Sequence, residues 1–224
     1  MNTKLFGIAA ALASLVAMSS APALASTVVF SLSAAAVGNQ PTSDEPLDLG
    51  MDFTVNKSGV TVDSLGAFTN GLYSVLVTLY NVTTGTATIV AQTTVGPGLP
   101  VSNYLFSPIS LTTLTSGDTY QINAVYTADN LDYNPYESYV GPKPSVVFNS
   151  LGGALTFAGD YYSFGDTGAV ATTYDSLSTN GYGAGSFAVT PLPSTWSMLL
   201  IGFIGLGFVA YRGGRNSPAA CPAV

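Results

Sequence analysis

Hydrophobic and polar residues alternate over much of the chain between residues 26 and 190. Because side chains point alternately to the two faces of a strand, this alternation predicts β-strands with one buried face. The clearest strands are expected at residues 73–80 and 119–126. Their core-facing positions are expected to be Tyr73, Val75, Val77, Leu79, Tyr120, Ile122, Ala124 and Tyr126. On the other face of the first strand, Thr78 is expected to face solvent, although large neighbouring side chains indicate partial cover there.

Glycine, proline, asparagine and serine separate the expected strands and predict turns or loops at residues 81–85, 96–100 and 116–118. The remaining strands are expected at residues 28–33, 49–55, 60–68, 86–95, 101–106, 145–148, 154–157 and 186–190. Many short strands rich in Thr, Val, Tyr and Phe are typical of β-sandwiches. The pattern therefore predicts an all-β sandwich at residues 26–177 and a Gly-rich stalk at residues 178–190. No helix longer than one turn is expected in this part of the chain.

The amino end has the pattern of a cleaved secretory signal peptide. Lys4 precedes an apolar stretch from Leu5 to Met18, and Ala23-Leu24-Ala25 matches the small-residue cleavage site. The apolar stretch is too short to span a bilayer. We therefore expect residues 1–25 to be removed on export, which leaves a mature chain that begins at Ser26.

A second apolar stretch, residues 196–211, contains no charged residue. At about 1.5 Å per residue, a helix of this length covers roughly 24 Å, slightly less than the ~30 Å hydrocarbon core of a bilayer. Trp196 and Tyr211 stand at its ends, where aromatic rings favour the headgroup region, and Arg212 and Arg215 follow. Positive residues are retained on the cytoplasmic side. The pattern thus predicts a helix in the inner membrane that anchors an exported domain.

A proline-rich hexad precedes this apolar stretch. Its residues are Pro191, Leu192, Pro193, Ser194, Thr195 and Trp196. With the apolar helix and the basic residues Arg212 and Arg215, the hexad resembles the PEP-CTERM sorting domain over residues 191–216, with Leu192 in place of the usual glutamate. The resemblance implies that exosortase, a membrane enzyme, recognises this tail and that the protein moves on to the cell envelope, surface or extracellular matrix. The short tail at residues 217–224 is not explained by it.

The stretch from Leu65 to Tyr120 carries a second resemblance. Its recurring features are Leu65-Gly66-Ala67-Phe68, Leu79-Tyr80-Asn81 and Leu114-Thr115-Ser116-Gly117-Asp118-Thr119-Tyr120. They are similar to the small jelly-roll-like β-sandwich modules of PEP-CTERM proteins and of some carbohydrate-active multidomain proteins. The resemblance implies a binding or structural unit.

All 12 acidic residues of the chain fall between residues 26 and 190, where Lys57 and Lys143 are the only cations. Such an acidic domain repels nucleic acid and anionic lipid headgroups, so neither is expected as a partner. The chain has no histidine, which excludes Ser-His-Asp catalysis and histidine-ligated metal sites. The single cysteine, Cys221, lies beyond the apolar stretch, so no disulfide is expected in the exported domain.

The densest polar cluster, residues 129–139, is expected to be a loop, and a second acidic and aromatic loop is expected at residues 160–166. Oxygen-bearing side chains are the ligands that Ca²⁺ accepts, and the candidates are Asp129, Asp132, Asn134 and Glu137. Tyrosines suit stacking against sugar rings, and the candidates are Tyr133, Tyr136, Tyr139, Tyr161 and Tyr162. The alternatives are a solvated acidic loop that holds no ion and tyrosines that pack beneath the loop as a small core.

These observations predict a non-catalytic exported protein that associates with extracellular polysaccharide and needs no cofactor, unless the loop at 129–139 holds Ca²⁺. One alternative is a structural protein that self-associates through the edges of its sheets, as a charge-poor chain rich in Thr and Val can do. Another is a polysaccharide hydrolase, which needs two carboxylates about 5–9 Å apart, one of them with a raised pKa. The sequence shows no such pair.

Overall fold

The computed structural model describes residues 26–32, 46–101, 103–127, 146–165, 167–175, 182–190, 202–204 and 206–207. The chain divides into two compact units, one that ends at Pro191 and one that begins at Leu192. The first unit contains all the strands, and the described residues of the second are helical.

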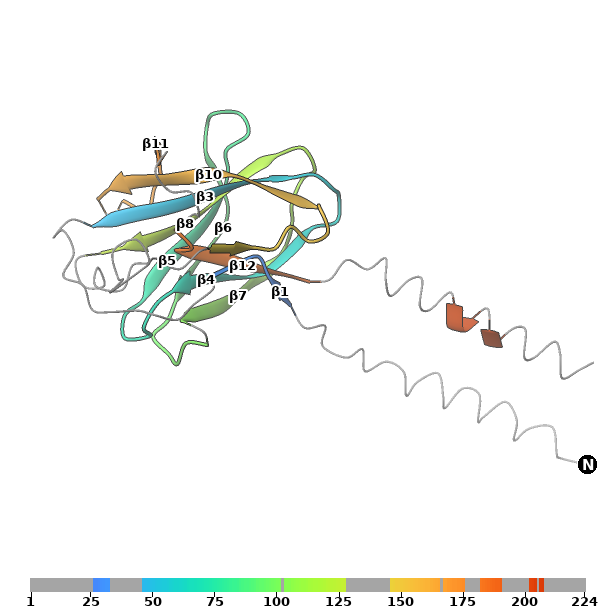
Figure 1. Ribbon diagram of the computed structural model, residues 1–224. Helices are drawn as coiled ribbons and strands as arrows, with labels where there is room; N and C mark the ends of the chain where they lie inside the picture. The colour runs from blue at the N-terminus through green and yellow to red at the C-terminus, as the bar shows by residue number, and fades with distance from the viewer. Residues whose placement is uncertain are drawn as a thin grey trace, which may run out of the picture. The chain divides into compact units, whose positions relative to one another are not determined.

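The first unit is built from antiparallel sheets (Figure 1). Its strands are β1 (Thr27–Val28), β2 (Phe30–Leu32), β3 (Leu47–Val55), β4 (Thr61–Phe68), β5 (Val75–Asn81), β6 (Thr88–Val95), β7 (Tyr104–Thr113), β8 (Thr119–Tyr126), β9 (Val146–Phe148), β10 (Leu155–Phe164), β11 (Thr173–Tyr174) and β12 (Gly185–Thr190). One sheet has the order β1-β12-β4-β7, a larger one β11-β10-β3-β8-β5-β6, and β2 pairs with β9. The all-β class expected from the sequence is confirmed.

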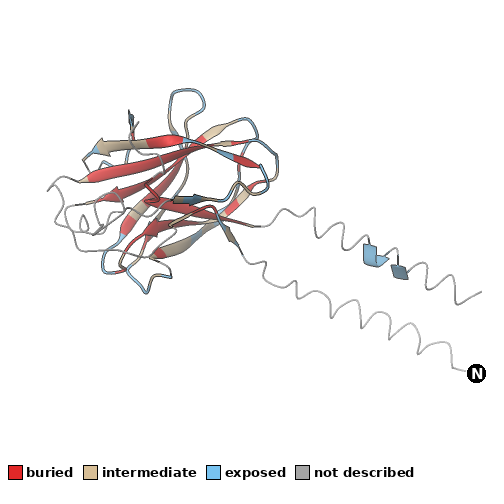
Figure 2. Ribbon diagram, viewed as in Figure 1, coloured by how far each residue is buried: buried red, intermediate tan, exposed pale blue. Residues whose placement is uncertain are grey.

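The core lies between the two larger sheets, and β3, β5, β8 and β12 are buried along most of their length (Figure 2). Phe53 of β3 stacks on Phe187 of β12, with ring centroids 4.8 Å apart, so the six-stranded sheet packs directly on the four-stranded sheet. Phe30 of β2 meets both rings edge-on, at 6.2 and 6.0 Å. Two facing sheets with an aromatic core between them form a sandwich-like arrangement.

The alternating patterns predicted the central strands well. β8 spans the residues expected for it, and its four expected core positions are all buried. In β5, Val75, Val77 and Leu79 are buried as expected. Tyr73 is 44% exposed because it precedes the strand, so the prediction for this residue is wrong. The turn after β5 forms around Gly85, whose φ of 76° is a backbone conformation that glycine adopts without strain.

The prediction of a stalk at residues 178–190 is wrong for the part of this range that forms a strand. Gly185–Thr190 form β12, which pairs with β1 on one side and β4 on the other, and the strand expected at 186–190 is thereby confirmed. The glycines allow close packing here, since a Cβ on Gly185 would lie 3.0 Å from Cγ1 of Ile122. The sandwich therefore extends to Thr190, well beyond the expected boundary at 177.

In the second unit, residues 202–204 and 206–207 are helical. Within the part of the chain that the structure describes, no helix has both the length and the apolar character needed to cross a membrane. The signal peptide expected at residues 1–25 lies outside the described residues. The same holds for the proline-rich hexad at 191–196, for Arg212 and Arg215, and for most of the apolar stretch at 196–211.

Candidate functional site

The outer face of the six-stranded sheet, which points away from the core, carries buried polar side chains. They are Asp48 and Asp52 of β3, Thr78 of β5, and Gln121 and Asn123 of β8. The cross-strand register places Asp52 opposite Gln121 and Asn123 opposite Thr78, so these side chains share one face. Thr78 was expected to face solvent, and that expectation is wrong because another segment covers this face.

Residues 167–172, which we call the covering segment, cross the outer face of β3, β8 and β5. Thr167 donates a hydrogen bond to Oδ2 of Asp48 at 2.9 Å. Nδ2 of Asn123 donates to the carbonyl of Ala169 at 2.6 Å, and the Tyr80 hydroxyl donates to the carbonyl of Gly168. Side chains of the sheet thus satisfy the backbone of the covering segment, which explains why polar residues lie on a buried face.

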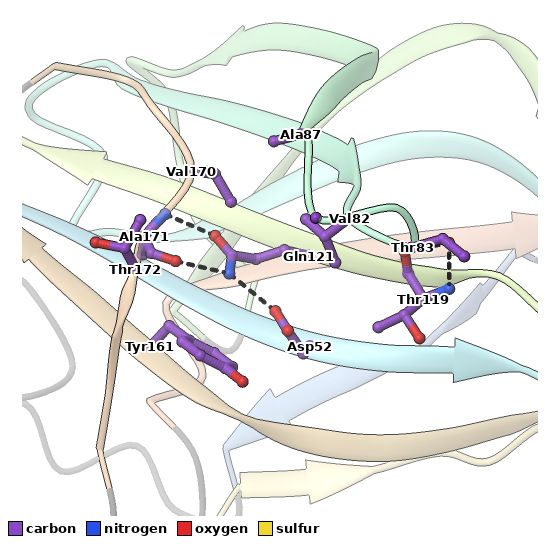
Figure 3. Close-up of a pocket in the computed structure, with 11 residues that line it drawn as sticks. Asp52, Val82, Thr83, Ala87, Thr119, Gln121, Tyr161, Val170, Ala171 and Thr172 are labelled. Carbon is purple, nitrogen blue, oxygen red and sulfur yellow. Dashed lines mark hydrogen bonds between the residues drawn. The ribbon is translucent and has the colours of Figure 1, made fainter.

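Gln121 is the centre of this network (Figure 3). Its Oε1 accepts from the amide of Ala171 at 2.8 Å, and its Nε2 donates to the carbonyl of Ala171 at 3.1 Å. The same nitrogen donates to Oδ1 of Asp52 at 2.9 Å. Gly50 provides the space for this side chain, because a Cβ at that position would lie 2.6 Å from Cδ of Gln121. One glutamine therefore holds both the covering segment and the Asp52 carboxylate.

A cleft of about 370 Å³ lies beside Gln121, between the covering segment and the turn that joins β5 to β6 (Figure 3). Its lining residues are Asp52, Val82, Thr83, Gly85, Ala87, Thr119, Gln121, Tyr161, Val170, Ala171 and Thr172. The turn is fixed to β8, since the Thr119 amide donates to Oγ1 of Thr83 at 2.9 Å and that hydroxyl donates back to the Thr119 carbonyl at 3.3 Å. Both walls of the cleft are thus tied to the sheet that forms its floor.

Asp52 is the only charged residue among the described residues that line the cleft. Its side chain is 8% exposed. Burial raises the pKa of Asp52 to about 6, and the hydrogen bond from Gln121 opposes this rise. Burial also raises the pKa of Tyr161, and the negative charge of Asp52 adds to that effect. The cleft is therefore an acidic site with hydroxyl, amide and aromatic groups around it.

The residues expected in a loop at 160–166 belong in large part to β10, so that expectation is wrong for Asp160–Phe164. A register shift between Phe157 and Gly159 lets β10 continue along the whole of β3. Successive residues of a strand face opposite sides. Tyr161 accordingly lines the cleft, whereas Tyr162 packs against the core and meets the Phe164 ring at 5.5 Å.

The other predicted ligand-binding residues lie outside the described residues. They are Tyr133, Tyr136 and Tyr139, and the calcium candidates Asp129, Asp132, Asn134 and Glu137. Among the residues that the structure does describe, no group of three or more acidic or cysteine side chains is arranged to hold a metal ion.

Sequence reasoning missed Asp52 and Gln121. A signal for both was present, because Asp48 and Asp52 alternate with large apolar residues in β3, and Gln121 and Asn123 do so in β8. Polar side chains on one face of two central strands indicate that this face carries either a polar cover or a ligand.

Comparisons with models of known protein families, with curated proteins and with solved structures found no match to this chain.

Proposed function

We propose that this chain is a non-catalytic exported protein whose sandwich binds extracellular polysaccharide in the cleft on the outer face of the six-stranded sheet. The observation that carries the proposal is the composition of that cleft. Three threonines that carry hydroxyl groups (Thr83, Thr119 and Thr172), the Asp52 carboxylate and Tyr161 with its ring line one cleft. Sugar rings need hydroxyl and amide partners at their edges and an aromatic ring against their apolar face.

The cleft favours binding over hydrolysis. Glycoside hydrolases use two carboxylates about 5–9 Å apart, and Asp52 is the only carboxylate among the described residues that line this cleft. A single acid with a raised pKa can hold a ligand group. Hydrolysis also needs a second carboxylate as base or nucleophile, and the described lining of the cleft does not supply one.

Two terminal signals support export and sorting. The first 25 residues have the features of a signal peptide. The tail from Pro191 to Arg215 resembles a PEP-CTERM signal, which implies recognition by exosortase in the inner membrane and delivery to the envelope or matrix. The stretch from Leu65 to Tyr120 resembles a jelly-roll-like module. This resemblance agrees with a binding unit in the envelope or matrix.

The proposal is tested by retention of the full-length protein, in neutral detergent, on exopolysaccharide isolated from its source organism. Tyr161→Ala removes the aromatic ring of the cleft and is expected to weaken retention roughly fivefold or more. Tyr73→Ala is the matched control, because Tyr73 is an exposed tyrosine that does not line the cleft. Equal retention of the two variants and the wild type would remove the cleft from the binding function.

A structural protein that self-associates through a sheet edge is the second candidate, and β6 favours it. β6 is an edge strand of the six-stranded sheet, contains neither charge nor proline, and has Ile89 60% exposed. Charged residues and proline usually protect edge strands against pairing with another chain. β7, an edge strand of the other sheet, contains Pro108. If β6 joins two copies, Ile89→Lys will convert oligomers to monomers in sedimentation velocity. A wild-type chain that is monomeric at all concentrations would exclude this candidate.

A further inference from the structure

Among the described residues that line the cleft, no cation accompanies the Asp52 carboxylate. Its Oδ1 accepts from Gln121, and no described residue donates to its Oδ2, which is not enclosed by protein. Lys57 is the only basic residue that the structure describes, and its ammonium donates to the carbonyl of Gly152 at 2.9 Å. Lys57 does not line the cleft.

The surroundings of Asp52 are nonetheless suited to a positive charge. Among the described residues, the titratable groups that share its side of the sheet are acids and phenols, none of which supplies a cation: Asp48, Tyr80, Tyr161 and Tyr174. The Tyr161 ring lines the same cleft, and a tyrosine ring attracts a cation within about 6 Å of its centroid. Carboxylate and ring lie on neighbouring strands, since Tyr161 pairs with Gly50, two residues before Asp52.

A partly buried carboxylate is stabilised most by a charged hydrogen-bond donor. A divalent metal is a poor candidate here, because hard cations need several oxygen ligands and Asp52 is the only carboxylate of the described lining. An ammonium group needs only one carboxylate and a few neutral acceptors, and Thr83, Thr119 and Thr172 supply hydroxyl oxygens in the same cleft.

We propose that the cleft selects a saccharide that bears a free amine, such as a deacetylated hexosamine unit, with its ammonium group on Asp52 and its ring against Tyr161. This inference rests on the proposed saccharide-binding function and adds the charge of the ligand. Uronic acids and phosphorylated sugars are excluded from the cleft by repulsion from the same carboxylate.

Isothermal titration of the full-length protein in neutral detergent at pH 6.5 tests the inference. The two probes are a glucosamine tetramer and its fully N-acetylated counterpart. They differ only in whether the amines are free or acetylated. We expect the glucosamine tetramer to bind at least tenfold more tightly than the acetylated tetramer. Raising the salt concentration is expected to reduce this difference, because the pair that causes it is ionic.

Asp52→Asn is the decisive variant, since the new side chain keeps an oxygen that accepts the Gln121 hydrogen bond. It is expected to weaken binding of the glucosamine tetramer about tenfold and to change binding of the acetylated tetramer less than twofold. Asp63→Asn is the control, because Asp63 lies on β4 of the other sheet. The midpoint of thermal unfolding verifies that each variant is folded.

The outcomes separate the inference from the function on which it rests. If both tetramers bind equally, or if Asp52→Asn leaves the affinity for the glucosamine tetramer unchanged, the amine specificity is wrong and saccharide binding stands. If neither tetramer nor the exopolysaccharide binds, both the inference and the proposed function are overturned.

Discussion

A carboxylate on a covered sheet face loses part of its hydration, and Asp52 keeps one strong interaction in return, the hydrogen bond from Gln121. The result is an acid whose pKa is raised from 3.8 to about 6 in the folded protein. The same residue is the one charged group of the described cleft lining. Its protonation therefore connects the stability of the sandwich to the chemistry of the cleft.

Asp52→Asn is expected to stabilise the protein at pH 8 but not at pH 4. In the folded state ionisation of Asp52 is disfavoured, whereas the unfolded chain ionises it at its ordinary pKa. The free energy of unfolding therefore falls as the pH rises through about 6, and the variant escapes this loss. A pKa rise of this size corresponds to a loss of at most about 3 kcal/mol in the free energy of unfolding. Solvent screening at the open cleft reduces this loss to ~1 kcal/mol. Urea unfolding at the two pH values measures the difference, and an equal change at both would contradict the assignment.

Gly50→Ala is expected to destabilise the protein by about 1–3 kcal/mol, because the added methyl group would displace the Gln121 side chain and the hydrogen bonds that it makes to Ala171. Denaturant unfolding gives the magnitude, and faster cleavage within residues 167–172 by a protease would show that the covering segment is released. Gly98→Ala is the control, since its Cβ would meet Leu105 at an ordinary 3.5 Å. Equal stability of the two variants would mean that Gln121 does not need this space.

At the scale of elements, alternation predicted those strands that have one apolar and one polar face. It located β8 and most of β3 and β5, because one face of each supplies large core side chains. Alternation failed for segments whose conformation depends on a partner that is distant in the sequence. Asp160–Phe164 resemble a polar loop until β3 is present to pair with them, and Gly183 and Gly185 resemble a linker until Leu32 and Ile122 lie against them.

Tyr161 is the only residue of the cleft that was predicted as a ligand-binding residue. The others were missed because their role depends on distant parts of the chain. Asp52 and Gln121 lie in strands that the sequence located. Their role, however, depends on the covering segment, which binds Gln121 from 50 residues further along the chain, and Gln121 in turn holds Asp52. A segment without regular alternation or strong turn signals gives no local indication of the sheet face on which it will lie.

β12 provides a test of the revised domain boundary. A chain of residues 26–190 is expected to unfold in one cooperative transition, whereas a chain of residues 26–184 lacks β12 and leaves β1 and β4 without their shared partner. The shorter chain also lacks Phe187, whose ring stacks on Phe53, and loss of one such buried ring costs about 3–5 kcal/mol. Thermal unfolding followed by circular dichroism compares the two chains. Equal stability of the shorter chain would mean that residues 185–190 are a stalk and not part of the sandwich.

At the scale of the whole molecule, we propose that two terminal signals direct the acidic sandwich across the inner membrane. Deletion of residues 191–224 is expected to shift the protein from the membrane fraction to the medium or periplasm. Arg212→Glu combined with Arg215→Glu, which keeps the apolar stretch, is expected to disturb its orientation. Cell fractionation with immunoblotting measures both effects. An identical distribution of the deleted and full-length chains would show that the tail does not direct sorting.

The proposed function depends on saccharide binding at the outer face of the six-stranded sheet. Hydrogen–deuterium exchange of the full-length protein, measured with and without fragments of the source exopolysaccharide, tests this directly. Binding in the cleft predicts slower exchange in peptides that cover residues 81–87, 119–121 and 167–175, with unchanged exchange in β4 and β7 of the other sheet. Protection confined to β4 and β7, or to residues 129–139, would place the binding site elsewhere and contradict the account.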